Sequence, residues 1–334
     1  MYKMVQKILF LFDAEFAHKL GLTGLRVLKR CGLIRLVRKR VTEQPVEIMG
    51  LTFPNRVGLA AGMDKNGDYI DCLGALGFGF LELGTVTPRP QPGNPKPRLF
   101  RLVPEKAIIN RMGFNNKGVD HLINQVKKSK YQGIIGINIG KNFDTPVANA
   151  VEDYRICFRK AYACADYIAV NISSPNTKNL RDLQAGDELQ KLLSALKNEQ
   201  SKLVKQTNRY VPFAVKIAPD LTDSEVKNIA QILTANRVDA VIATNTTISR
   251  ESISGKKHSL ETGGLSGEPL KLPSDALLKK LISELNNAIP VIAVGGIMSA
   301  GDAEDKFNAG AKLVQIYTGF IYKGPDLIFE ILQR

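Results

Sequence analysis

Eight short apolar segments, separated by longer segments with helical spacing, run through residues 51–334 and constrain the fold more than any other feature. Segments that are apolar on both faces are typical of strands buried in a parallel sheet, and stretches such as 189–203 and 225–233 between them have helical spacing. Eight such units predict a closed (β/α)8 TIM barrel of the α/β class. An open, doubly wound sheet is the alternative, but no Gly-x-Gly-x-x-Gly motif follows the first segment. The apolar segments are Val57–Ala61, Phe80–Leu83, Ile134–Ile137, Tyr167–Val170, Phe213–Ile217, Ala240–Ala243, Val291–Val294 and Leu313–Ile316.

Nearly every predicted strand ends in glycine, an amide, a hydroxyl or lysine. In a barrel these carboxyl ends meet at one mouth, so we expect a large polar ligand there. The segment Asn171-Ile-Ser-Ser-Pro-Asn176 taken alone could equally be an ordinary turn, and it is the other strand ends that favour a site. These ends contain no Asp/Glu pair and no histidine, which disfavours glycosidase and metal-hydrolase chemistry. In order, the ends are Gly62-Met-Asp-Lys65, Gly84-Thr85, Asn138, Asn171–Asn176, Lys216 within its strand, Thr244-Asn-Thr246, Gly295-Gly296 and Tyr317-Thr318.

Two glycine-containing turns and two long connections indicate how a ligand would be held. Gly295-Gly296 follows the seventh predicted strand and Thr318-Gly319 follows the eighth, where barrels commonly bind phosphate. Glycine lets backbone N–H groups approach an anion, so this pattern predicts a phosphorylated ligand or cofactor. The connections after the second and sixth strands, which include 87–97 and 249–273, have the length of lids or binding loops.

The first 40 residues carry most of the positive charge, with ten Lys or Arg against Asp13 and Glu15, or +8 of the net +14. Gly21 and Gly32 are expected to interrupt the helical pattern here, and Thr23 could cap a second helix. The longest apolar run is too short to span a bilayer, and no signal-peptide cleavage pattern follows it. We therefore predict two basic amphipathic helices that lie on a membrane surface, rather than a nucleic-acid-binding arm; helices that merely pack on the barrel are the alternative. The apolar stripe consists of Val5, Ile8, Leu9, Phe12, Phe16 and Leu20.

This pattern divides the chain into a helical membrane-associating segment, residues 1–40, and a barrel domain, residues 41–334. The four cysteines, Cys31, Cys72, Cys157 and Cys164, show no Cys-x-x-Cys spacing, and the three histidines are far apart in the sequence. Neither set has the spacing of a zinc or iron–sulfur site, so we predict no metal.

Together the strand-end motifs resemble the dihydroorotate dehydrogenases, and in particular their membrane-associated, quinone-reducing class. The resemblance covers essentially the whole chain and implies an FMN enzyme that oxidises dihydroorotate to orotate in pyrimidine synthesis. The motifs that carry it are Ala60-Ala-Gly-Met-Asp-Lys65, Gly84-Thr-Val-Thr-Pro-Arg-Pro90, Asn110-Arg-Met-Gly-Phe114, Asn138-Ile-Gly-Lys141, Asn171–Asn176 and Gly295-Gly296.

The resemblance also implies roles for individual residues. Several amides suit a planar diamide such as orotate, while Lys65 balances its carboxylate. Lys216 would place positive charge near the flavin, where the reduced form becomes anionic. The residues implied for FMN are Ala61, Gly62, Lys65, Thr85, Asn138, Asn171, Lys216, Thr244, Gly267, Gly296, Tyr317 and Thr318. Those implied for orotate are Lys65, Asn110, Arg111, Met112, Gly113, Phe114, Asn171, Asn176, Asn245 and Thr246.

Ser174 falls on the position of the family's catalytic base. A free hydroxyl is a poor base, so Thr177 and a water chain shielded by Phe114 are the hypothetical proton relay. The soluble class resembles this pattern but uses cysteine as the base, and no cysteine lies in 171–176. In the quinone class, helices like those expected at the amino terminus form the mouth of a tunnel, and His18, Arg101 and Tyr317 are the candidates around the quinone head group. A surface position for His18 and a structural ion pair for Arg101 are the alternatives.

The partners implied are dihydroorotate and orotate, a membrane quinone (ubiquinone or menaquinone) and the membrane surface, with no iron–sulfur partner subunit and a monomeric chain. The implied location is peripheral, on the cytoplasmic face of a bacterial inner membrane. Two rival functions remain open at this point. A Schiff-base lyase would use Lys216 as the nucleophile, which borohydride trapping would reveal in a colourless protein. A non-catalytic barrel tethered to membranes would bind lipid without flavin or turnover.

Overall fold

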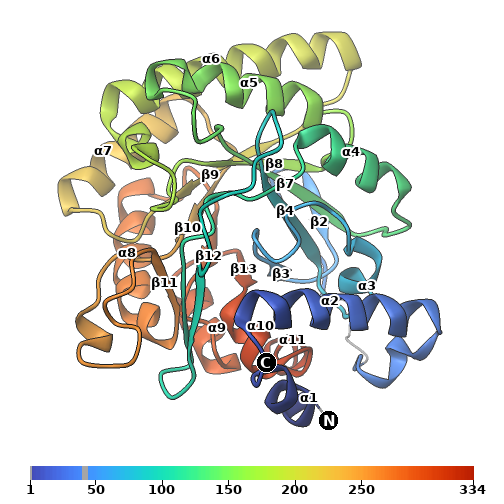
Figure 1. The fold of residues 1–334 in the computed structure, drawn as a ribbon. Coiled ribbons are helices and arrows are strands. Elements are labelled where there is room, and N and C mark those ends of the chain that lie inside the picture. The colour runs from blue at the N-terminus through green and yellow to red at the C-terminus, as the bar shows by residue number, and fades with distance from the viewer. Residues whose placement is uncertain (1, 40–43) are drawn as a thin grey trace.

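A computed structural model describes residues 2–39 and 44–334 of the chain. Eight parallel strands close into a barrel (Figure 1), because each strand pairs with the next in sequence and the last pairs with the first. The prediction of a (β/α)8 barrel is therefore confirmed. The barrel strands are β3 (Val57–Leu59), β4 (Phe80–Val86), β7 (Ile134–Ile139), β8 (Tyr167–Asn171), β9 (Phe213–Ile217), β10 (Ala240–Ala243), β12 (Val291–Val294) and β13 (Leu313–Ile316).

Helices surround the barrel and bury one apolar face each against it. The side chains of Leu192 and Leu196, for example, are completely buried between helix and sheet, and each such leucine stabilises the fold by roughly 1.5–3 kcal/mol. The helices are α3 (Ile70–Gly74), α4 (Val119–Lys128), α5 (Ala150–Ala161), α6 (Gly186–Thr207), α7 (Asp223–Ala235), α8 (Lys271–Leu285), α9 (Ala300–Asn308), α10 (Thr318–Lys323) and α11 (Asp326–Leu332). Short 3-10 turns lie at Leu33–Leu36, Val147–Asn149, Leu180–Gln184, Glu251–Ile253 and Glu268–Leu270.

The amino-terminal end of the barrel is closed by a hairpin, β1 (Val46–Ile48) with β2 (Leu51–Phe53). Phe53 packs edge-to-face on Phe80, with ring centroids 5.2 Å apart, and Phe80 packs on Tyr167. Gly136 makes room for this layer, since a Cβ there would lie 2.1 Å from the Tyr167 ring. The lower half of the barrel is thus filled, which leaves the carboxyl ends of the strands for a site.

The two long connections meet in space. The first forms β5 (Leu99–Leu102) and β6 (Ala107–Asn110), the second contributes β11 (Gly264–Gly267), and the three pair as an antiparallel sheet in the order β11-β6-β5. Asn110 is paired with both Leu99 and Gly264. This non-local pairing fixes both connections over the mouth of the barrel.

The amino-terminal segment forms two helices, α1 (Tyr2–Leu9) and α2 (Ala14–Arg30) (Figure 1). Helix α1 packs on α10, and α2 packs on α3 and β5. The predicted break was wrong in position. It lies at Asp13, whose carboxylate accepts hydrogen bonds from the backbone of Glu15 and Phe16 as the cap of α2. Gly21 and Thr23 lie inside that helix, because one glycine costs only about 1 kcal/mol in a helix held by packing.

Gly32, with φ of 73°, follows the end of α2 as expected. The proposed domain boundary between residues 40 and 41 lies outside the described residues. Among the described helices, none combines the length and hydropathy that crossing a membrane requires.

Candidate active site

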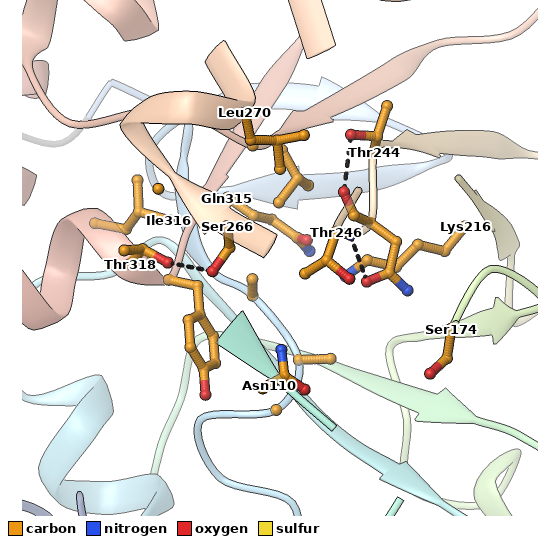
Figure 2. A pocket seen from close by; sticks show the side chains of 18 of the residues that line it. Asn110, Ser174, Lys216, Thr244, Thr246, Ser266, Leu270, Gln315, Ile316 and Thr318 are labelled. Carbon is orange, nitrogen blue, oxygen red and sulfur yellow. Dashed lines mark hydrogen bonds between the residues drawn. The ribbon is translucent and has the colours of Figure 1, made fainter. Parts of the chain in front are cut away.

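A cavity that opens to solvent lies at the carboxyl ends of the barrel strands. Figure 2 shows side chains from several strands and both connections pointing into it, among them Asn110, Ser174 and Lys216. Most residues expected at the site line this one cavity. They are Ala61, Gly62, Lys65, Thr85, Asn110, Met112, Gly113, Phe114, Asn171, Ser174, Asn176, Lys216, Thr244, Asn245, Thr246, Gly267, Gly296, Tyr317 and Thr318.

Three expected residues do not line the cavity. Asn138 lies beneath its wall, where its Oδ1 accepts hydrogen bonds from Thr85 Oγ1 (2.5 Å) and Asn171 Nδ2 (3.2 Å). The Arg111 guanidinium points elsewhere, because it pairs with Glu261 at 2.6 Å and lies over the Phe100 ring. Thr177 is buried and directly follows Asn176 in the sequence. Its Oγ1 has no hydrogen-bond partner among the described residues.

Amide side chains around Ser174 hold one another in fixed orientations. Asn176 Nδ2 donates to Asn110 Oδ1 at 3.2 Å, and Asn245 Nδ2 donates to the Ser173 hydroxyl at 3.0 Å. The Ser174 hydroxyl accepts the Asn176 backbone N–H at 3.3 Å. Asn176 Oδ1 is buried and has no partner among the described residues. A buried acceptor is costly when unpaired, so this oxygen is placed to receive an N–H group from a ligand.

Lys65 supplies positive charge to the cavity from the turn after β3. Its Nζ donates to the Gly62 carbonyl at 3.0 Å. Burial lowers the pKa of Lys65 to about 8, although Glu15 on α2 favours the charged form. The ammonium therefore predominates at neutral pH and can pair with an anionic ligand.

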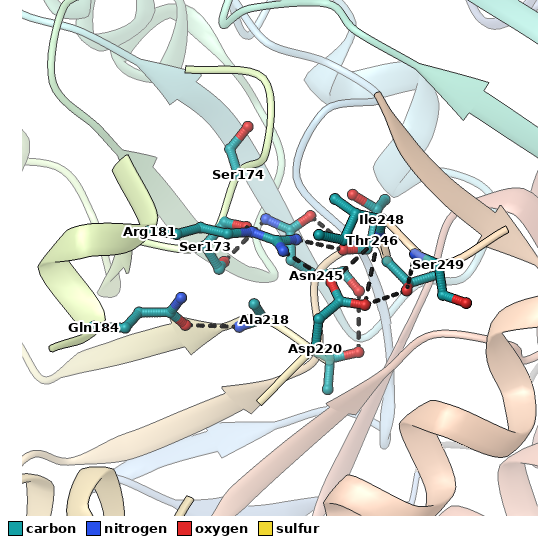
Figure 3. A network of polar contacts seen from close by, with 12 residues as sticks. Ser173, Ser174, Arg181, Gln184, Ala218, Asp220, Asn245, Thr246, Ile248 and Ser249 are labelled. Atoms are coloured by element: carbon teal, nitrogen blue, oxygen red, sulfur yellow. Dashed lines mark hydrogen bonds and ion pairs between the residues drawn. The ribbon is translucent and has the colours of Figure 1, made fainter. Parts of the chain in front are cut away.

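A second network, shown in Figure 3, holds the loops that carry Ser174 and Thr246 together. The Arg181 guanidinium donates to the Ser173 carbonyl at 3.1 Å and to the Thr246 carbonyl at 3.0 Å. It also forms a 2.8 Å ion pair with Asp220, which accepts from the Thr247 hydroxyl and from the Ile248 backbone. Arg181 and Asp220 thus join two cavity walls from behind.

Sequence reasoning missed two buried polar residues of the barrel, Glu82 and Gln315. Gln315 lines the cavity from β13, and Glu82 on β4 accepts a hydrogen bond from its Nε2 at 2.6 Å. A signal was available, since each is a single polar residue within an otherwise apolar strand segment. A polar side chain at such a position needs a buried partner or a ligand.

The cavity has the features that a flavin mononucleotide needs. Gly296 follows β12 with φ of 73°, and a Cβ there would lie 2.2 Å from the Lys271 Cα, so only glycine leaves the backbone this close to the next segment. At the other end, Gln315 Oε1 is buried and has no hydrogen-bond partner among the described residues. A glycine turn at the position where barrels commonly bind phosphate, and an unpaired acceptor in the same cavity as Lys216, together fit a ligand with a phosphate and a hydrogen-bonding ring.

A larger, mainly apolar tunnel lies between α1, α2 and the barrel. His18, Arg101 and Tyr317, the three residues predicted to surround a quinone head group, all line it. Arg101 donates to backbone carbonyls of Leu9 and Phe10 where α1 ends, and its guanidinium lies over the Phe10 ring. Burial lowers the pKa of His18 to about 4, so its imidazole is neutral at neutral pH. Tyr317 lines the tunnel and the polar cavity alike.

Comparisons with known proteins give a consistent result. The family model described as dihydroorotate dehydrogenase matches residues 44–334. A relative from Chromobacterium violaceum, named dihydroorotate dehydrogenase (quinone), is 58% identical over 330 residues, which is 99% of this chain and 96% of that protein. A relative of the same name from Neisseria meningitidis is 55% identical over 100% of this chain and 99% of its own length.

Solved structures agree with the sequence relatives. The structure of the Eimeria tenella enzyme in complex with ferulenol superimposes with a TM-score of 0.88 at 39% identity, and the match covers 96% of this chain and 90% of that one. The sequence relatives are more than half identical over nearly their full lengths, and the solved structure shares the fold. The chain therefore belongs to the dihydroorotate dehydrogenase family, in its quinone-dependent class.

Proposed function

We propose that the polar cavity oxidises dihydroorotate to orotate and that the apolar tunnel receives the quinone that removes the electrons. The activity is that of an FMN-dependent oxidoreductase of pyrimidine biosynthesis, as the family implies. One observation carries the assignment of the two spaces: Tyr317 borders both of them, so a group held in the cavity is separated from the tunnel by a single side chain.

The amide cluster is suited to a planar diamide. Asn110, Asn176 and Asn245 present carboxamides that can both donate and accept. The hydrogen bond from Asn176 to Asn110, and that from Asn245 to the Ser173 hydroxyl, fix which end of each amide faces the ligand. Lys65 pairs with the carboxylate of dihydroorotate. A ligand held by both sets of groups can lie in only one orientation over the site.

Ser174 takes the proton from ring carbon C5. Its hydroxyl is buried on the loop after β8. The Thr177 hydroxyl, which has no hydrogen-bond partner among the described residues, is the next acceptor in the proposed relay, and Phe114 shields this relay from bulk water. Bound FMN would supply the acceptor for the hydride from C6 and the route by which the electrons reach the quinone. Lys216 and Gln315 line the cavity where the chain would hold the flavin ring, and Gly296 and Thr318 lie at the phosphate end.

The tunnel opens among exposed apolar side chains of α1, α2 and the following turn. Leu11, between α1 and α2, is 84% exposed, and Leu36, after α2, is 64% exposed and lies between Arg35 and Arg38. Exposed apolar groups beside lysine and arginine suit the interface of an anionic bilayer. The chain would therefore sit as a peripheral protein on the cytoplasmic face of the inner membrane, with a ubiquinone or menaquinone entering from the lipid.

A substitution at Gly24 can distinguish the role of the apolar tunnel from that of the polar cavity. It lines the tunnel from within α2, and beyond the helix's own backbone a Cβ there would meet no heavy atom of the described residues within 4 Å. Gly24→Leu should fill the tunnel without straining the helix, whereas Gly24→Ala, the matched control, leaves it open. In anaerobic stopped flow, Gly24→Leu should slow flavin reoxidation by a quinone at least tenfold and leave reduction by dihydroorotate unchanged. Equal reoxidation rates in both variants would refute the assignment of the tunnel.

A further inference from the structure

Glu82 is a completely buried carboxylate directly beneath the cavity. Its Oε1 accepts hydrogen bonds from Asn138 Nδ2 (2.8 Å) and Lys216 Nζ (3.4 Å). Its Oε2 accepts from Gln315 Nε2 (2.6 Å) and from the Tyr167 hydroxyl (3.0 Å). The four donors come from four different strands, β7, β8, β9 and β13. The Glu82 carboxylate is therefore hydrogen-bonded to one side chain from each of these strands.

Three of these donors either line the cavity or support the residues that line it. Lys216 and Gln315 line the cavity themselves, and Asn138 passes the network on to Thr85 and Asn171 in its wall. Gln315 Nε2 donates its hydrogen bond to Glu82. The other end of this amide, Gln315 Oε1, has no partner among the described residues and is therefore free to accept a hydrogen bond from a ligand. Burial and the neighbouring Glu82 charge hold the pKa of Tyr167 well above its usual value, so the phenol stays a donor.

A buried carboxylate is expensive, and an apolar side chain would fill the barrel without that cost. Glu82 also lies 3.4 Å from Lys216, a cation that faces the flavin site. The carboxylate therefore opposes the effect of Lys216 on any negative charge that develops in the cavity, and Coulomb interactions over such distances are strong in a site without water.

We propose that Glu82 is a positioning residue that orients Lys216, Gln315 and Asn138 toward the flavin and offsets the charge of Lys216, so that the bound FMN keeps a lower reduction potential than Lys216 alone would give. The proposal rests on the proposed function, since it requires FMN in the cavity. Reduction adds negative charge to the flavin ring, which Lys216 favours and Glu82 opposes. Without Glu82 the flavin would be easier to reduce by dihydroorotate but would hold its electrons more tightly against the quinone.

The test is an anaerobic redox titration of purified protein with its bound FMN against an indicator dye. Glu82→Gln should shift the midpoint potential to a more positive value, raising the ratio of reduced to oxidised flavin at a fixed solution potential by about tenfold. Lys216→Met should shift it to a more negative value, and the double variant should return close to the wild type. Tyr167→Phe is the matched control, because it removes one donor to Glu82 without changing the charge, and its potential should stay near that of the wild type.

If Glu82→Gln alone does not fold, the double variant still tests the proposal. Removing both Glu82 and Lys216 leaves neither member of this buried ion pair without its partner. A double variant whose potential equals that of Lys216→Met would overturn the proposal, as would a Glu82→Gln potential that is unchanged or more negative. A wild-type protein that binds no FMN would contradict the proposed function itself. Retained FMN with an unshifted potential in Glu82→Gln would contradict only the role of Glu82.

Discussion

Lys65 predicts how substrate binding depends on pH. Its pKa lies near 8 because burial disfavours the ammonium, while Glu15 partly restores it. The charged form is needed to pair with the carboxylate of dihydroorotate, and it is lost as the pH rises through the pKa. One pH unit above that value about a tenth of the free enzyme retains the ammonium, so the apparent Kd should be about tenfold weaker, and two units above about a hundredfold.

The assay is the concentration dependence of flavin reduction by dihydroorotate in anaerobic stopped flow between pH 6.5 and 9.5. This experiment separates Kd from the limiting rate, which also reflects the proton transfer to Ser174. Lys65→Arg, which keeps its charge throughout, should flatten the profile. Glu15→Gln should move the loss of affinity to lower pH, because it removes the carboxylate that raises the pKa. A wild-type Kd that is constant from pH 7 to 9.5 would refute the reasoning.

Three further predictions concern the base, its support and the membrane surface. Ser174→Ala should retain FMN and orotate but slow flavin reduction about 10²–10⁴-fold, and unchanged reduction would remove Ser174 from the mechanism. Arg181→Met releases the carbonyls of Ser173 and Thr246 and should lower the limiting reduction rate by up to about 10²-fold with FMN still bound; a loss confined to thermal stability would limit Arg181 to a structural role. Leu11→Asp combined with Leu36→Asp should abolish sedimentation with anionic vesicles while sparing reduction by dihydroorotate, whereas undiminished sedimentation would place the membrane contact elsewhere.

The barrel could be predicted because its strands are buried on both faces. The predicted and observed bounds coincide for β9, β10, β12 and β13, where the apolar run and the strand have the same length. Strand β4 runs further, to Val86, because its last residues still pair with β7 although Gly84 and Thr85 interrupt the apolar pattern.

The amino-terminal break could not be placed from hydrophobic spacing, which continues across it. The carboxylate of Asp13 decides the start of α2 by capping two backbone N–H groups. The pairing of β11 with β6 was equally inaccessible, since it joins residues about 150 positions apart through ladders that no local pattern specifies.

The site was predictable to the extent that it follows the strand ends, which converge on one cavity in any such barrel. Of the residues missed, Gln315 lines the cavity itself, and the others lie one step behind its surface. Glu82 and Arg181 hydrogen-bond to residues that line the cavity, and Asp220 forms an ion pair with Arg181. The role of these residues depends on three-dimensional distances rather than on position in a motif. Conversely, Arg111 lies within a recognised motif, yet its side chain is drawn away by Glu261.

An anaerobic absorption spectrum of the purified protein tests the central claim most directly. It should be recorded before and after dihydroorotate is added, and again after a short-chain quinone. We expect a flavin band that dihydroorotate bleaches and the quinone restores. A bleached band that returns only with fumarate or NAD would contradict the role of the quinone, and a band that dihydroorotate does not bleach would contradict the proposed oxidation itself.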